Sequence, residues 1–171
     1  ESARYIKMAA DQNLPKAMYN YALILDNGDG IPENKEEAAK YYKMAADNGD
    51  IDAMYNYAMM LEDGEGVPVD IDEARKYYKM AADKGSVKGM FNLALLLFNK
   101  NEIKQSAHYY KLAAENGDAD AMNNFAVMLE NGYGVSVDMK KAAVYYKMAA
   151  EMGQSESMNN FTQKASFLMD H

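Results

Sequence analysis

The stretch "DAMYNYAMMLEDGEGVPVDIDEARKYYKMAADKG" at residues 52–85 decides the fold, because variants of it run through the whole chain. Its block Tyr-Tyr-Lys-Met-Ala-Ala has counterparts that begin at Tyr5, Tyr41, Tyr109 and Tyr145. Its block Asp-Ala-Met-Tyr-Asn-Tyr has counterparts that begin at residues 16, 88, 120 and 156. Self-similarity of this length is the sequence signature of a repeat protein.

Each block carries residues that are typical of the start and the end of a short helix. Glycines after the Ala-Ala pairs suit the left-handed position that ends a helix, and we expect it at Gly49, Gly85, Gly117 and Gly153, with Asn13 in the first copy. The residues that follow can cap the next helix: Asp50, Ser86 and Asp118. Caps for the other helix class are Asn34, Asp70 and Asp138, and Pro15 fits a first helical turn.

Two short helices cannot bury their apolar faces alone, but stacked pairs can. The sequence therefore predicts an all-α protein, a right-handed superhelical α-solenoid of about ten antiparallel helices. Alanine pairs let the helices approach closely, and Tyr and Met fill the remaining gaps. Gly-x-Gly followed by Ile or Val, at 28–31, 64–67 and 132–135, joins the two helix classes. Its glycines permit positive φ.

The pattern Ala-x-x-Asn-aromatic-Ala, Gly-x-Gly-Val, then Ala-x-x-Tyr-Tyr-x-x-Ala-Ala-x-x-Gly closely resembles the SEL-one-like repeat, a relative of the tetratricopeptide repeat. The chain has Tyr-Tyr where that family usually has Trp-Tyr, and Tyr-Ala, Leu-Ala or Phe-Ala where it has Leu-Gly. Both changes keep the size class of the side chains, so we expect the same fold.

We divide the chain into a single repeat array. A half repeat covers 1–14, and full repeats cover 15–50, 51–86, 87–118 and 119–154. The more polar segment 155–171 is expected to be a C-terminal capping helix. The half repeat 1–14 has no capping sequence, so we expect this end to continue a longer protein, to pack on another domain or to self-associate.

The third repeat is four residues shorter and lacks Gly-x-Gly-Val. Phe98 stands where the other repeats have Asp26, Glu62 and Glu130. We expect Phe98 to fill the volume of the lost valine, at a cost of about 3–5 kcal/mol on replacement by alanine. Residues 99–101 are expected to form a tight turn between helices.

One arc of the first helix in each repeat is uniformly apolar and reads as core, whereas the opposite arc is mixed. In the related tetratricopeptide repeats the mixed arc lines a concave groove, so the resemblance implies that this groove binds the partner. The candidate partner-binding residues on this arc are Tyr19, Asn20, Leu23, Tyr55, Asn56, Met59, Phe91, Asn92, Leu95 and Asn124.

The asparagine column of this arc has two interpretations, because the amide both donates and accepts hydrogen bonds. It could fasten neighbouring helices, or it could hold the backbone of an extended peptide. The apolar column likewise either fills the inner wall of the superhelix or forms an exposed patch of the kind that marks interaction sites. We favour the patch.

Charge and composition limit the classes of partner and the compartment that we expect for this protein. Net charge is −8, which disfavours nucleic acid and anionic membranes, and no run of apolar residues is long enough to span a membrane. Cysteine is absent, which is compatible with a reducing compartment such as the cytoplasm. Hydrophobic residues make up 49% of the chain, enough for a packed core.

No catalytic constellation, cofactor motif or metal-ligand set is evident. The two histidines are His108, expected at the surface, and the terminal His171. Asp26 to Gly30 only superficially resembles a calcium loop, because neither register supplies the carboxylates. A hydrolase activity like that of some cysteine-rich relatives is therefore disfavoured.

We expect a non-enzymatic scaffold or adaptor that binds a protein or peptide, and the resemblance extends this to signalling complexes and protein quality control. The alternative is a structural or regulatory segment that packs on another domain or self-associates through residues 1–14.

Overall fold

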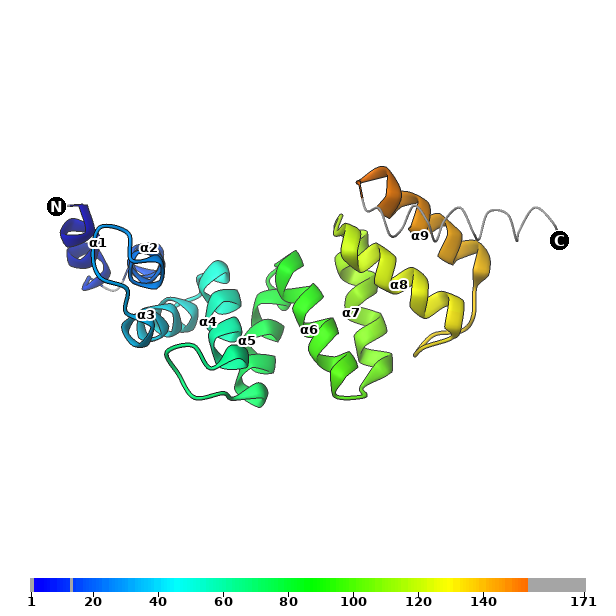
Figure 1. Cartoon of the computed structure of the whole chain (residues 1–171), viewed down its shortest axis with the longest axis horizontal. Helices are drawn as coiled ribbons and strands as arrows, with labels where there is room; N and C mark the ends of the chain where they lie inside the picture. The colour runs from blue at the N-terminus through cyan, green and yellow to red at the C-terminus, as the bar shows by residue number, and fades with distance from the viewer. Residues whose placement is uncertain (1, 13, 154–171) are drawn as a thin grey trace. The chain divides into compact units, whose positions relative to one another are not determined.

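The computed structural model describes residues 2–12 and 14–153, and these residues form an all-helical protein without strands (Figure 1). The helices are α1 (Ser2–Ala10), α2 (Pro15–Asn27), α3 (Lys35–Asp47), α4 (Ile51–Asp63), α5 (Ile71–Asp83), α6 (Val87–Asn99), α7 (Ile103–Glu115), α8 (Ala119–Asn131) and α9 (Met139–Glu151). The all-α prediction is confirmed. The predicted capping helix at 155–171 and the role of Asn13 fall outside the described residues.

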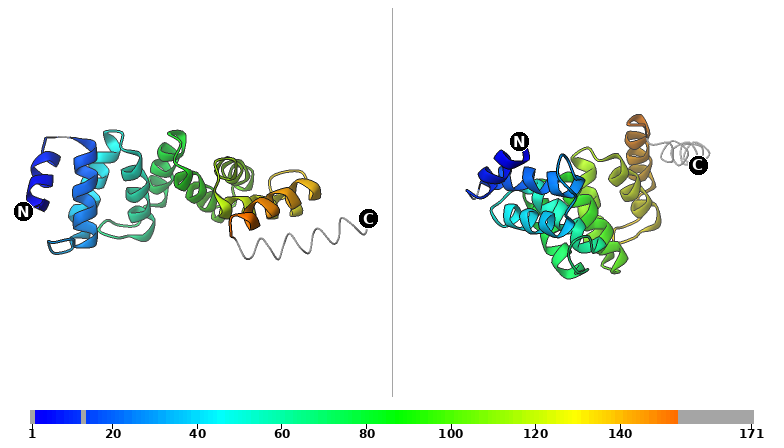
Figure 2. Two further views of the ribbon diagram at one scale, coloured as in Figure 1. Left: turned by 90° about the horizontal axis from the view of Figure 1, so that it is seen from above. Right: turned by 60° about the vertical axis from the view of Figure 1, so that its left-hand side comes forward.

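The chain divides into two compact units, residues 1–89 and 90–171, with the boundary inside α6. In the first unit α2 packs against α1 and α3, α3 against α4, and α4 against α5. In the second unit α8 packs against α7 and α9. Within each unit successive helices run antiparallel, as two directions of view show (Figures 1 and 2).

The caps predicted from sequence are confirmed. The side chains of Asn34, Asp70 and Asp138 each accept a hydrogen bond from the backbone amide three residues later, at 2.9–3.0 Å. Asp50, Ser86 and Asp118 do the same for the other helix class. Each cap satisfies one of the amides that a helix start leaves without an intrahelical partner.

Aromatic pairs lock the second helix of a repeat onto the first. Tyr57 on α4 meets Tyr77 on α5 edge-on, with ring centroids 4.8 Å apart, and Phe125 meets Tyr145 in the same way at 5.1 Å. Alanines at the contact positions, such as Ala45 and Ala81, are completely buried. Small side chains at the crossings and edge-to-face rings between them fill the core of each unit.

The Gly-x-Gly loops reach from one repeat to the one before it. A side chain at Gly66 would collide with the backbone carbonyl of Lys35, and one at Gly134 with that of Ile103. Both glycines also have positive φ, of 69° and 70°. Glycine is therefore required at these positions for two reasons: the backbone conformation of the loop and its close contact with the preceding repeat.

The shortened third repeat makes the predicted tight turn. Asn101 has a φ of 62°, and backbone amides 100–102 bond to the last carbonyls of α6. Ser106, fully buried, donates its hydroxyl proton to the carbonyl of Ala94 at 2.7 Å and so ties α7 to α6.

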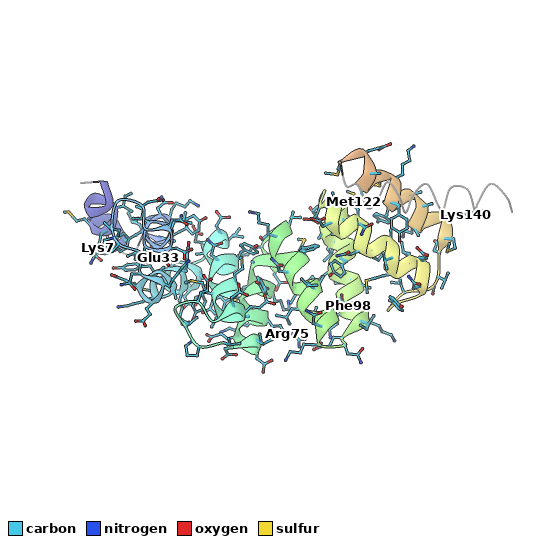
Figure 3. The ribbon with its side chains drawn as sticks, viewed as in Figure 1. Lys7, Glu33, Arg75, Phe98, Met122 and Lys140 are labelled. Atoms are coloured by element: carbon cyan, nitrogen blue, oxygen red, sulfur yellow. The ribbon has the colours of Figure 1, made fainter. Side chains whose placement is uncertain are left out.

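The prediction for Phe98 is wrong, because its side chain is 40% exposed and replaces no buried valine (Figure 3). Position 98 lies at the edge of the helix contacts, as Asp26 and Glu130 do in their repeats, and these are only half-buried. A periodic pattern assigns the helix position, but it does not show that a large ring placed there stays at the surface.

We therefore expect Phe98→Ala to lower the free energy of unfolding by less than about 1 kcal/mol. Phe125→Ala is the matched control, because Phe125 is 2% exposed and its loss should cost about 3–5 kcal/mol. Urea unfolding of both variants measures the difference. Equal costs would contradict the assignment of Phe98 to the surface.

Candidate functional site

The two arcs predicted for the first helix of each repeat separate cleanly by burial. On α4 the apolar arc is buried in full, at Ala53, Met54, Tyr57, Ala58, Met60 and Leu61. None of the opposite-arc positions 52, 55, 56, 59, 62 and 63 is buried, and α8 repeats the division. On α2 the separation is weaker, since Ala17 and Ile24 are half-buried.

In the first unit the mixed arc carries apolar groups that solvent reaches. Met59 is 37% exposed, and the side chains of Tyr19, Leu23 and Tyr55 are half-buried. Tyr19 rests on Tyr42 with ring centroids 5.9 Å apart. Tyr55 rests in the same way on Tyr78, which belongs to the same repeat as Tyr55. The rings are thus supported from one side and open on the other.

Lysines cover part of these rings. The Nζ of Lys16 lies 4.3 Å from the centroid of Tyr19, and that of Lys88 lies 5.8 Å from the centroid of Tyr55. Lys16 also pairs with Asp52 at 3.1 Å, and this hydrogen bond is the main reason that the pKa of Lys16 is raised. A ligand that stacked on Tyr19 would meet a flexible cation as well as the ring.

In the second unit Phe91 packs against Tyr110 with ring centroids 5.7 Å apart. Leu95 is 38% exposed, whereas the side chains of Phe91, Asn92 and Asn124 are half-buried. The candidate residues of each unit therefore share the mixed arc of their helices, and none of them is buried.

The asparagine column lies beside tyrosine hydroxyls, an arrangement that the sequence analysis did not identify. The amide of Asn56 lies close to the hydroxyl groups of Tyr19 and Tyr42 and partly offsets the rise in their pKa values. Tyr42 donates its hydroxyl proton to Asp26 at 3.2 Å. Burial, followed by the nearby charge of Asp26, raises the pKa of Tyr42, so the hydroxyl keeps its proton and the contact with Asp26 persists at neutral pH.

The same carboxylate–tyrosine contact recurs along the chain. Tyr78 donates to Glu62 at 2.8 Å, and Tyr146 donates to Glu130 at 2.9 Å. This contact could have been predicted from the sequence, because an acid precedes its tyrosine by 16 residues in these three repeats. In the third repeat Phe98 holds the acid's position, and the amide of Asn124 lies beside the hydroxyl of Tyr110. Burial raises the pKa of Tyr110 to about 12.

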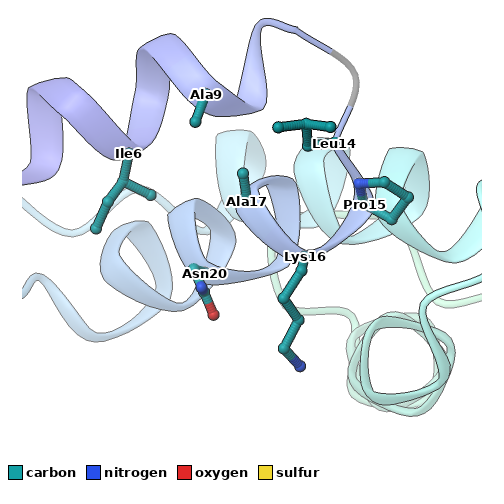
Figure 4. Close-up of a pocket in the computed structure, with 7 residues that line it drawn as sticks. All are labelled: Ile6, Ala9, Leu14, Pro15, Lys16, Ala17 and Asn20. Carbon is teal, nitrogen blue, oxygen red and sulfur yellow. The ribbon is translucent and has the colours of Figure 1, made fainter.

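A second candidate surface lies between α1 and α2 (Figure 4). It is a hollow of about 610 Å³ whose lining includes Ile6, Ala9, Leu14 and Ala17. Leu14 is 52% exposed, and Met8 on α1 is 54% exposed. This surface is apolar, and it lies at the N-terminal half repeat for which self-association was predicted.

His108 is exposed and lies against Tyr109. Within residues 2–12 and 14–153, no three His, Asp or Glu side chains are grouped so as to hold a metal ion. No helix in these ranges combines the length and the apolar character needed to cross a membrane.

Comparison with known proteins places these features in a family. The Sel1 repeat matches residues 15–50, 51–86, 87–118 and 119–154. No sequence among the curated proteins matches the chain.

Solved structures resemble the chain over most of its length. A protective antigen of uropathogenic Escherichia coli with an SLR fold is 27% identical and superposes with a TM-score of 0.90, over 93% of this chain and 35% of the antigen. A Sel1 repeat protein from Oxalobacter formigenes is also 27% identical, with a TM-score of 0.81 over 93% of this chain and 65% of that protein. The chain thus spans less than two thirds of either relative.

A more distant structure shares the fold alone. It is the immunity protein Pa5087 of Pseudomonas aeruginosa, 20% identical with a TM-score of 0.55, and the match covers 91% of this chain and 59% of that protein.

The two interpretations of the asparagine column differ in what a truncation should do. If Asn56 fastens helices, Asn56→Ala removes the amide beside the hydroxyls of Tyr19 and Tyr42 and should lower the free energy of unfolding by about 1–2 kcal/mol. Asn20 occupies the same column but is exposed, so Asn20→Ala should stay within about 0.5 kcal/mol of the parent. Thermal or urea unfolding compares them, and equal stabilities would favour a purely functional role for Asn56.

Proposed function

Because the chain belongs to the Sel1 repeat family, we propose that it is a non-enzymatic scaffold that binds a peptide or a partner protein on the mixed arc of its first helices. Sel1 repeat proteins generally mediate interactions between proteins. Six of the ten candidate residues lie in the first unit and four in the second, and each set is a proposed docking surface by itself.

The observation that carries the proposal is the exposure of apolar groups on this arc. In the first unit Met59 is 37% exposed, beside half-buried tyrosines contributed by two successive repeats. Aromatic rings held rigidly from one side lose little conformational freedom when a ligand covers the other side. Apolar side chains that gather in this way support a docking surface.

The position of the asparagines beside tyrosine hydroxyls is compatible with binding. The amide of Asn56 lies close to Tyr19 and Tyr42, and a primary amide has two donors and two acceptor positions. The amide can therefore orient the tyrosine ring and still meet the backbone of a peptide. In this proposal the apolar column supplies the affinity, and the asparagines set the orientation of the partner.

A variant at the exposed positions tests the proposal without breaking the helix contacts. Tyr55→Ala combined with Met59→Gln should lower recovery of the partner in a quantitative pull-down by about tenfold or more, because interface anchors contribute most of the binding energy. Val69→Gln is the control, since Val69 is 59% exposed and lies in the loop after α4. Unchanged recovery by the double variant, with its circular dichroism intact, would refute the proposed site.

Self-association is the second candidate function, and the apolar hollow between α1 and α2 favours it. Leu14→Glu should then shift the sedimentation coefficient of the chain toward that of a monomer, because a charge would be buried in the contact. Val69→Glu adds the same charge in the same unit outside the hollow. A parent chain that sediments as a monomer at high micromolar concentration would rule this function out.

A further inference from the structure

The second unit contains an apolar cleft between the α6–α7 pair and α8. Its volume is about 240 Å³, and its lining includes Leu95, Phe98, Tyr110, Asn124, Val127 and Tyr133. Phe98 is 40% exposed and Tyr133 is 48% exposed, so the rim is open to solvent. The lining carries no charged side chain, and its polar groups are the hydroxyls of Tyr110 and Tyr133 and the amide of Asn124.

The first unit has a cleft at the equivalent place, between the α2–α3 pair and α4, and its chemistry is the opposite. It measures about 100 Å³, and its lining includes Asp26, Asn56, Asp63 and Glu65. Lys35 spans it, with Nζ 2.7 Å from a carboxylate oxygen of Asp26 and 3.2 Å from one of Glu65. Hydrogen bonding to Asp26 is the main cause that raises the pKa of Lys35.

All three members of this ionic group are replaced by apolar or aromatic residues in the second unit. Alignment of the repeats puts Phe98 at the position of Asp26, Ile103 at that of Lys35 and Tyr133 at that of Glu65. The replacements are mutually consistent, because loss of the lysine alone would leave two neighbouring carboxylates without a compensating charge. The result is a larger cleft without charge.

The volume of this cleft fits one side chain. A cavity of about 150 Å³ lined by Leu, Ile and Phe holds a benzene molecule, so about 240 Å³ accommodates a phenylalanine or leucine side chain. Pockets for whole drug-sized ligands usually measure about 300–1,000 Å³. A free cofactor or metabolite is therefore a poorer fit than a side chain that enters from a longer molecule.

The polar groups of the cleft suit a peptide backbone. In the other repeats the tyrosine equivalent to Tyr110 donates its hydroxyl proton to a carboxylate, as Tyr146 does to Glu130 at 2.9 Å. Phe98 offers Tyr110 no such acceptor, and the amide of Asn124 lies beside the Tyr110 hydroxyl. A peptide carbonyl at this place would accept from the hydroxyl or the amide, while its side chain filled the apolar cleft.

We propose that the cleft lined by Leu95, Phe98, Val127 and Tyr133 receives one phenylalanine or leucine side chain from an extended segment of the partner protein. The proposal rests on the scaffold function and specifies the chemistry of the partner. The acid-lined cleft of the first unit does not accept such a side chain, because burial of its carboxylates against an apolar group is unfavourable.

The full chain can be titrated with N-acetyl-L-phenylalanine amide as the probe and followed by ¹H–¹⁵N correlation NMR. We expect saturable shifts at Phe98, Asn124 and Val127, with a dissociation constant of about 1 mM as befits a single anchor residue. N-acetyl-L-glutamate amide, which carries a charge, should produce no saturable shifts there. Failure of the phenylalanine probe to saturate, or shifts confined to another surface, would overturn the proposal.

Variants separate the cleft from the fold. Phe98→Asp combined with Tyr133→Glu restores two carboxylates of the sister cleft at exposed positions and should weaken probe binding by about tenfold or more. Val137→Glu adds charge in the same loop at a side chain that is 61% exposed and should leave binding unchanged. Equal binding by the double variant and the parent would count against the cleft.

The scaffold function is tested separately through the first unit. If the Tyr55 and Met59 variant loses its partner while the parent fails to bind the probe, only the cleft proposal falls. If the probe binds but that variant keeps its partner, the arc of the first unit is excluded and the cleft stands.

Discussion

The close approach of neighbouring helices is the constraint on which this structure depends. Each of the helices from α2 to α9 has 13 residues, about the length at which an isolated helix is marginal in water. Stability must therefore come from contacts between helices. Alanines that are at most 6% exposed, such as Ala46 and Ala82, allow the backbones to come together. Tyrosine rings then close the space that small side chains leave open.

This constraint explains why the fold could be predicted from the sequence. Gly49 and Asp50 act locally, since one ends a helix and the next begins another, and their effect does not depend on distant residues. The alternation of Tyr57 with Tyr55 likewise assigns one ring to the core and the other to the mixed arc. Because these weak local signals recur in every repeat, together they predicted both the helices and their buried faces.

The contacts between repeats could not be predicted in the same way. The amide of Asn56, on the first helix of one repeat, lies beside the hydroxyl of Tyr42, on the second helix of the preceding repeat, and helical periodicity gives no information on which polar groups meet there. Phe98 shows the same limit, because its position was known but its exposure depends on whether neighbouring helices cover it. The arc on which each candidate residue lies could therefore be predicted from the sequence, whereas its hydrogen-bond partners could not.

Loss of the loop in the third repeat acquires a physical meaning from these contacts. In the first unit Lys35 belongs to an ionic group that holds the Gly-x-Gly loop of the next repeat through Glu65. Where Phe98 and Ile103 replace the ion pair, Tyr133 replaces the loop's acid, so the joint between repeats changes from ionic to apolar. A repeat array can tolerate such a change because each joint involves only neighbouring repeats. One joint can therefore acquire a distinct binding chemistry while the joint of the first two repeats keeps its ionic group.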